Sequence, residues 1–396
     1  MRSPYFMYVV ASVLAVVGVP AAAQGTASNQ LATTTKAADG KVTLPVTILD
    51  KHGKLVSGLT ANDFTLTDNG QAQTIANLTQ QSNLPFLLGL LVDTSGGMLG
   101  AMSSERTAAE RFVGQMLPAE AQNAIQGSEA FLIHFDREVE LLQDFTSSAA
   151  RLDQQLEQMG PTAEERNNPQ GPDTMSSAEG RDGGGGQPTL HGSRVGDTTL
   201  YDAIYLACNQ LMQPKHGRKA LVVFSGGVDQ GSIETLNEAI DAAQRANVSI
   251  YTLYFRGNEE HNRNNFPGMG PRGGMGYPGG NPGGYPGGYP GGYPGRYPGG
   301  APSGGGGHAL ANGRQIMEQL SRRTGGVYFV VRRPEDLEGV YNLVAEALHG
   351  QYLLTYTPNP PDKDGGWHNV ALKPKKNDLK VIIPESYYDP GNEKQQ

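Results

Sequence analysis

An unbroken apolar run at residues 87–92 (LLGLLV) constrains the fold of this chain more than any other sequence feature. The run is too short to cross a membrane, and it is typical of a strand covered on both faces of a parallel sheet. Similar runs follow at residues 130–135 (AFLIHF), 220–224 (ALVVF), 248–255 (VSIYTLYF) and 326–331 (GVYFVV). The chain therefore contains several strands that need helices on both sides.

Helical periodicity separates these runs. Apolar residues recur at helical spacing over residues 109–116, and further helices are predicted at 152–156, 201–212, 233–246, 315–323 and 337–348. Residues 139–145 form another strand, which we expect at an antiparallel edge of the sheet. Strands that alternate with helices predict a doubly wound, Rossmann-like α/β domain.

Short strands with alternating apolar residues flank this domain on both sides. On the amino-terminal side, residues 42–48 alternate, and residues 68–70 (DNG) are a strong hairpin-turn signal. On the carboxyl-terminal side, alternation returns at residues 351–357, 367–372 and 381–383. Because the ends of a nested chain often lie close together, we expect both sets to form one small β-sandwich-like unit. The α/β domain is then an insertion between the two halves of this unit.

The amino terminus has the pattern of a secretory signal peptide. Arg2 supplies a positive charge, residues 8–19 form a short apolar run, and small residues precede Gln24 as a cleavage site. We expect an exported protein, secreted or periplasmic, without a membrane span after signal removal; the alternative is an uncleaved anchor. The predicted organisation is a signal peptide at 1–23, a leader at 24–39, an amino-terminal β unit at 40–84, the α/β domain at 85–350, carboxyl-terminal strands at 351–390 and a tail at 391–396.

Two segments without periodicity interrupt the α/β domain, at residues 160–195 and 256–307. The second contains a run of Tyr-Pro-Gly-Gly and closely related tetrads over residues 277–300. Proline removes backbone donors and glycine raises the entropy cost of ordering, so we expect a disordered surface loop. This loop is either a tyrosine-bearing tether for a glycan, a wall polymer or a protein, or a low-complexity insertion without a dedicated ligand.

Three polar segments lie where strands end or helices begin. Asp93 and Ser95 follow the run at 87–92, residues 196–203 (GDTTLYDA) place hydroxyls before a helix, and residues 225–229 (SGGVD) follow a buried strand. A carboxylate and a hydroxyl two residues apart suit a hard cation such as Mg²⁺. Ligands of open α/β sheets bind at the carboxyl edge of the strands, where all three segments are expected.

In this order, the three segments resemble the von Willebrand factor A (vWA) family. The resemblance covers roughly residues 85–350 apart from the insertions, and residues 46–68 extend it to the exported bacterial branch with flanking β segments. It implies a protein-binding or adhesion module with a metal-ion-dependent adhesion site. On the family's motif, Asp93, Ser95 and Thr198 would bind Mg²⁺, and a carboxylate of a protein partner would complete the metal's ligand shell.

Two positions depart from the family's motif. Gly97 stands where the motif has a serine, and Gly226 stands where it has an aspartate. We expect these losses to weaken Mg²⁺ binding by about tenfold or more, since outer-shell partners alone are worth roughly 10–100-fold. Asp229 is a possible substitute ligand. Three more residues are expected at the ligand-binding face: Asp197, Thr199 and Ser225.

Composition and missing motifs exclude several classes of function. The net charge of −8 argues against nucleic acid as a partner. The lone Cys208 cannot pair within the chain and excludes a thiolate zinc cluster, so we expect a small buried hydrophobe on a helix. The sequence has no Gly-x-Ser-x-Gly, His-Glu-x-x-His or phosphate-loop motif, and His134 next to Asp136 is expected to be structural.

The sequence therefore favours a binding protein over an enzyme: an extracytoplasmic, vWA-type adhesion module with a degenerate metal site. One alternative is a metal-free structural or envelope scaffold that acts through the Tyr-Pro-Gly-Gly loop. The other is a hydrolase, for which the sequence offers no convergent acid, base and nucleophile.

Overall fold

The computed structural model describes residues 40–80, 84–117, 127–160, 198–256, 305–361 and 365–391, without the side chains of 305–311. The signal peptide, the leader, most of both insertions, Asp197 and residues 392–396 lie outside this part, so the predictions made for them stay predictions. Within the described residues, no helix is long and apolar enough to span a membrane.

Six strands form one sheet, in the order β10-β9-β8-β5-β6-β7. The strands are β5 (Phe86–Asp93), β6 (Glu129–Phe135), β7 (Val139–Thr146), β8 (Arg218–Ser225), β9 (Val248–Phe255) and β10 (Tyr328–Val331). All neighbouring strands are parallel except β6 and β7, which confirms the predicted antiparallel edge. Every residue of β5, β8 and β9 is buried, as predicted from their apolar runs.

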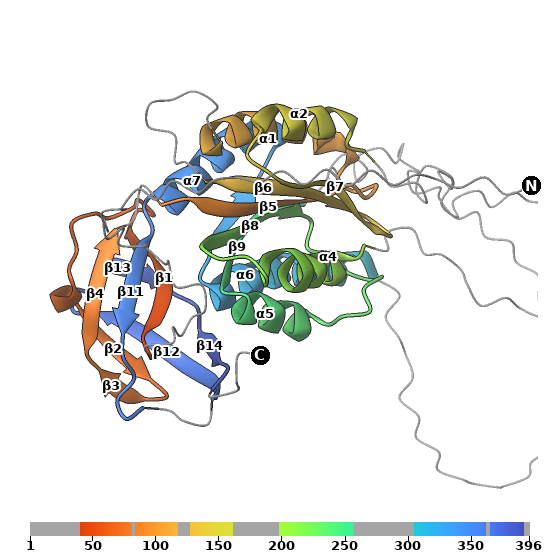
Figure 1. Ribbon diagram of the computed structural model, residues 1–396. Coiled ribbons are helices and arrows are strands. Elements are labelled where there is room, and N and C mark those ends of the chain that lie inside the picture. The colour runs from red at the N-terminus through yellow and green to blue at the C-terminus, as the bar shows by residue number, and fades with distance from the viewer. Residues whose placement is uncertain are drawn as a thin grey trace, which may run out of the picture. The chain divides into compact units, whose positions relative to one another are not determined.

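Helices cover both faces of this sheet (Figure 1). One face carries α1 (Met102–Met116), α2 (Ala149–Gln158) and α7 (Leu337–His349), and the other carries α4 (Leu200–Leu206), α5 (Leu236–Arg245) and α6 (Gly305–Thr324). Helix α4 continues into a π-helical turn, Ala207–Met212, where Cys208 is fully buried. Each face has its own apolar core, so the predicted doubly wound α/β architecture is confirmed.

The single glycine within the apolar run of β5 leaves room for side chains from the two neighbouring strands. A Cβ atom at Gly89 would lie 2.3 Å from Cζ of Phe131 and 2.5 Å from Cδ2 of Leu221. Both contacts are shorter than real Cβ contacts, so the buried Phe131 ring occupies the space that a side chain at Gly89 would need.

The strand order changes direction at β5, with β6 on one side and β8 on the other. In open α/β sheets, ligands bind in the crevice outside the carboxyl ends of the strands at such a switch point. β5 ends at Asp93 and β8 ends at Ser225, so two of the predicted site residues meet at this edge.

Strands from both ends of the chain form the second part of the fold. Two four-stranded antiparallel sheets have the orders β13-β1-β11-β4 and β14-β12-β2-β3. Their strands are β1 (Val42–Asp50), β2 (Phe64–Asp68), β3 (Gln71–Gln73), β4 (Ile75–Gln80), β11 (Tyr352–Tyr356), β12 (Gly366–Pro374), β13 (Leu379–Ile382) and β14 (Ser386–Asp389). Both sheets contribute to one apolar core. The predicted β-sandwich-like unit is confirmed.

The hairpin between β2 and β3 has the turn that the sequence predicts. Asp68 pairs with Gln71 across a two-residue loop, and Asn69 and Gly70 have φ angles of 47° and 77°. Positive φ at both loop residues defines a type I′ turn, which asparagine and glycine adopt more readily than other residues.

Two elements differ from the sequence predictions. Helix α6 begins at Gly305, inside the predicted loop and well before residue 315, because glycines supply no apolar side chains from which a helical period can be recognised. Strand β14 was not predicted; it has four residues, and its inward-facing positions are Tyr387 and the acidic Asp389. Such a strand shows no apolar alternation.

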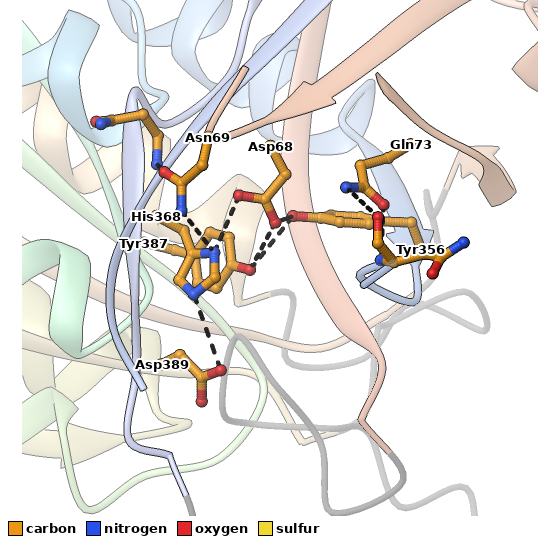
Figure 2. Close-up of polar contacts among 9 residues, drawn as sticks. Asp68, Asn69, Gln73, Tyr356, His368, Tyr387 and Asp389 are labelled. Atoms are coloured by element: carbon orange, nitrogen blue, oxygen red, sulfur yellow. Dashed lines mark hydrogen bonds and ion pairs between the residues drawn. The ribbon is translucent and has the colours of Figure 1, made fainter. Parts of the chain in front are cut away.

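Buried polar side chains connect the strands of the sandwich (Figure 2). Asp68 at the end of β2 accepts hydrogen bonds from the hydroxyls of Tyr356 (2.8 Å) and Tyr387 (3.1 Å). Its other oxygen lies 3.0 Å from Nδ1 of His368, whose Nε2 lies 4.0 Å from Asp389. All five side chains are buried, and they come from β2, β11, β12 and β14. The network therefore ties β14, the last strand of the described residues, to the first half of the sandwich.

The sandwich also contacts the α/β domain through β14 and the segment before it. The Ser386 hydroxyl donates a hydrogen bond to Gln244 of α5 (3.1 Å), and Arg322 of α6 pairs with Glu385 (2.6 Å). The Arg245 guanidinium lies over the ring of Tyr388 at 3.8 Å. These contacts join β14 to α5, and the residue before β14 to α6.

A buried acid between α1 and α7 should make stability depend on pH. Glu105 is fully buried and accepts a hydrogen bond from the Tyr341 hydroxyl. Burial raises the pKa of Glu105 from 4.5 to about 8, although the Tyr341 hydrogen bond acts against this rise. The group's contribution to stability is therefore complete below pH 4.5 and is lost as pH rises through about 8.

We expect Glu105→Gln to remove this pH dependence, because glutamine stays neutral throughout. Between pH 4.5 and about 8, the free energy of unfolding of the natural protein should fall relative to that of the variant. The fall should be at most ~1.4 kcal/mol per pH unit. Guanidinium unfolding of both proteins at the two ends of the window measures the difference. Parallel stability curves would contradict the assignment of this dependence to Glu105.

Candidate functional site

Four segments meet at the carboxyl edge of the parallel sheet: residues 93–97, 135–138, 198–202 and 225–234. The first two segments follow β5 and β6, the third leads into α4, and the fourth follows β8. We call them the loop ring. Hydrogen bonds join each segment to its neighbours, so that the segments hold one another in place.

Asp93 joins the first segment to the last. Its Oδ1 accepts a hydrogen bond from the Ser95 amide (3.0 Å), and its Oδ2 accepts one from the Ser225 hydroxyl (2.7 Å). The Ser225 oxygen in turn accepts the Gly227 amide (2.9 Å). Burial raises the pKa of Asp93, and the hydrogen bonds from Ser95 and Ser225 oppose this rise. Both oxygens of this carboxylate thus already have donors within the protein.

The segment after β6 joins the first and third segments. The Thr94 amide donates to the Phe135 carbonyl (2.9 Å), while the amide and the hydroxyl of Thr199 both donate to the Asp136 carbonyl (2.8 and 3.1 Å). Thr94 and Thr199 are buried, as is Asp136. Asp136 has no separate role among the sequence predictions, although an acid directly after a strand at this edge is a usable signal.

The third and fourth segments are joined at Thr198 and Asp229. The Thr198 hydroxyl donates to the Val228 carbonyl. One oxygen of Asp229 accepts the Tyr201 amide (2.9 Å) and the Ser232 hydroxyl (2.6 Å). Burial raises the pKa of Asp229. The pKa of Tyr201 is raised to about 12, mainly by burial and secondly by the charge of Asp229. In this arrangement Asp229 holds the start of α4.

Gly97 and Gly226 lie where the vWA motif has oxygen ligands. A Cβ atom at Gly97 would have nothing within 4 Å; at Gly226 it would lie 3.4 Å from the Phe255 carbonyl and 3.9 Å from Sδ of Met98. Neither glycine has a positive φ. Side chains could therefore be accommodated at both positions.

The residues present do not fit a dedicated Mg²⁺ site. Asp93 and Asp229 accept hydrogen bonds within the ring and the Thr198 hydroxyl donates one. These bonds leave lone pairs on the oxygens, so the misfit lies in the ligands that are missing. Across the described ranges, no three His, Cys, Asp or Glu side chains gather in a metal-binding arrangement. Mg²⁺ needs several oxygens in a near-octahedral arrangement, and the two glycines supply none. The ring is held by its own hydrogen bonds.

The structure thus brings together most of the residues predicted for the site. Asp93, Ser95, Thr198, Thr199, Ser225 and Asp229 all lie in the loop ring. Asp197 lies outside the described residues. The sequence missed Asp202, whose carboxylate accepts the amides of Ile233 (3.1 Å) and Glu234 (2.9 Å) and so fixes the last segment.

The known proteins that this chain matches are solved structures. No family model and no curated protein matches the chain. Among solved structures, proximal thread matrix protein 1 from the mussel byssus is 7% identical with a TM-score of 0.40, over 76% of this chain and 50% of that one. The chain thus spans about half the length of the mussel protein.

Two bacterial structures are similar over nearly their whole length. The vWF domain of the pilus tip protein Mfa5 from Porphyromonas gingivalis is 13% identical (TM-score 0.39; 67% of this chain, 95% of that one). The conserved hypothetical protein BatB from Bacteroides thetaiotaomicron is 12% identical (TM-score 0.36; 66% and 98%). These values are too low to transfer a function.

The chain's own features define the class of its central domain. The six-stranded sheet has one antiparallel edge strand and helices on both faces, and the Asp93-x-Ser95 loop lies at its switch point. This is a vWA-like α/β domain, inserted into a β-sandwich-like unit. Its assignment rests on the strand order together with the sequence of the loop ring.

Proposed function

We propose that this protein is an extracytoplasmic protein-binding module of the vWA type and that the loop ring is its ligand-binding face. The main support is the internally bonded ring at the topological switch point of the sheet. Ser95 is partly exposed and Gly96 and Gly97 are exposed, so the ring has a surface that a partner can reach. A preorganised face loses little conformational entropy on binding.

The proposal is for binding rather than catalysis, and for a face that needs no tightly bound cation. His134, the titratable residue that sequence analysis weighed as a base, is buried between the Gly160 carbonyl (2.8 Å) and Glu140 (2.7 Å). The proposed location, secreted or periplasmic, rests on the signal-peptide pattern of residues 1–23. A carboxylate from a partner would be bound only by a form of the site that holds a metal ion. The double variant Gly97→Ser/Gly226→Asp tests that form.

Site-specific photocrosslinking tests the ligand-binding face. Gly97→Cys carries a benzophenone maleimide on the ring, and Gly339→Cys carries it on α7 as a matched control, since both glycines are exposed with open space around them. Cys208 is fully buried and burial raises its pKa, so it should remain unlabelled. Each labelled protein is irradiated in an envelope extract of the producing cell.

We expect a discrete adduct from position 97 that position 339 does not give and that excess unlabelled protein suppresses. Equal adducts from both positions, or none from position 97, would refute the loop ring as the binding face. An adduct from position 97 that disappears when residues 257–304 are deleted would instead favour the scaffold that acts through its Tyr-Pro-Gly-Gly loop.

A further inference from the structure

A pocket of about 520 Å³ lies at one side of the loop ring, between the start of β7, helix α4 and the segment before α5. Its volume is in the range of pockets that bind small molecules or single side chains of a partner. Val139, Tyr205 and Leu206 supply apolar surface, and Ile233, a residue that is 91% exposed, lies on the rim. The other lining residues belong to the loop ring, so a partner on the ring can reach the pocket: Arg137, Glu138, Thr199, Asp202, Ile233 and Glu234.

The rim of this pocket is fixed. Asp202 accepts the amides of Ile233 and Glu234, and the Ser232 hydroxyl accepts the Asp202 amide (3.1 Å) while donating to Asp229. Ile233 is thus held in position although its side chain is not buried. An exposed apolar side chain on a fixed backbone, next to the apolar wall of a pocket, offers a partner apolar surface without the entropy cost of ordering the loop.

The charges around the pocket are mainly negative. Glu138, Asp202 and Glu234 line it, against the single guanidinium of Arg137. Desolvation raises the pKa of Glu234, and the nearby charges of Glu238 and Asp202 raise it further. The carboxylates therefore repel one another, and a cation on a partner would relieve that repulsion.

We infer that this pocket binds a protein segment in which an apolar side chain lies next to a lysine or arginine. The apolar side chain would fill the wall beside Ile233, and the cation would lie against Glu234 and Glu138. The inference rests on the proposed function and names its partner class. It differs from the metal-bridged case, in which the partner would present a carboxylate.

Peptide selection tests the partner class. A phage-displayed random peptide library is selected on the natural protein, and the affinity of synthetic copies is measured on Ile233→Ser, Glu234→Lys and the control Leu343→Ser. Leu343 is 47% exposed on α7, away from the pocket lining. All three positions are on the surface, and thermal unfolding confirms that each variant is folded.

We expect enriched peptides to pair Leu, Ile or Phe with Lys or Arg. Their affinity should fall about tenfold or more in both rim variants and stay unchanged in Leu343→Ser. Enrichment of acidic peptides, or of peptides indifferent to Ile233 and Glu234, overturns the inference. A position-97 photoadduct that persists when Ile233→Ser or Glu234→Lys is added to Gly97→Cys also overturns the inference and leaves the proposed function intact. Absence of the adduct from Gly97→Cys without either rim substitution overturns the proposed function itself.

Discussion

Asp68→Ala should destabilise the β-sandwich more than any other single polar substitution in it, by about 3–5 kcal/mol. The Asp68 carboxylate is buried and accepts hydrogen bonds from Tyr356 and Tyr387, and His368 lies beside it at 3.0 Å. Alanine would leave buried donors on three other strands without this acceptor, and each unsatisfied buried group costs about 1–3 kcal/mol.

Trp367 reports on this unfolding directly. It is the single tryptophan of the chain and lies in β12, with its ring 5.3 Å from that of Tyr388. Guanidinium unfolding followed by its fluorescence should show a much lower midpoint for Asp68→Ala than for Asp378→Ala, an exposed acid in the turn between β12 and β13. Asp68→Asn keeps one oxygen acceptor and should fall between them. Equal midpoints for both alanine variants would show that the network contributes little.

The sequence predicts the architecture well because local patterns determine it. Unbroken apolar runs are found in strands that are buried on both faces, as in β5 and β8, and alternation is found in sandwich strands with one face in the core, as in β11. The tripeptide at 68–70 predicts its turn through the positive φ of Asn69 and Gly70. In each case the signal lies within a few residues.

The contacts of the loop ring could not be predicted in the same way. The vWA resemblance identifies Asp93, Ser95 and Thr198, but the hydrogen bond of Asp93 to Ser225 joins residues far apart in the sequence. The sequence suggests Asp229 as a substitute metal ligand, whereas in the structure its carboxylate accepts hydrogen bonds from Tyr201 and Ser232. Periodicity carries no information about which donor satisfies which acceptor.

Restoring the motif should create a metal site in this protein. Gly97→Ser and Gly226→Asp together add a hydroxyl and a carboxylate at the switch point, and neither backbone position requires glycine. Each recovered contact should strengthen Mg²⁺ binding by about 10–100-fold, by analogy with losses of supporting ligands in other metal sites. The matched control is Gly114→Ser with Gly339→Asp, the same substitutions at exposed glycines on α1 and α7 with open space around them.

Isothermal titration with Mg²⁺ and Mn²⁺ tests most directly the claim that this vWA-like face is held by its own hydrogen bonds and not by a cation. The natural protein and the Gly114→Ser/Gly339→Asp control should give no binding heat at millimolar metal, while Gly97→Ser/Gly226→Asp should give a saturable isotherm. Sub-millimolar binding by the natural protein would contradict this claim. It would mean that Asp229 or another acid replaces the missing ligands, and that a metal-bridged partner carboxylate is the mode of binding.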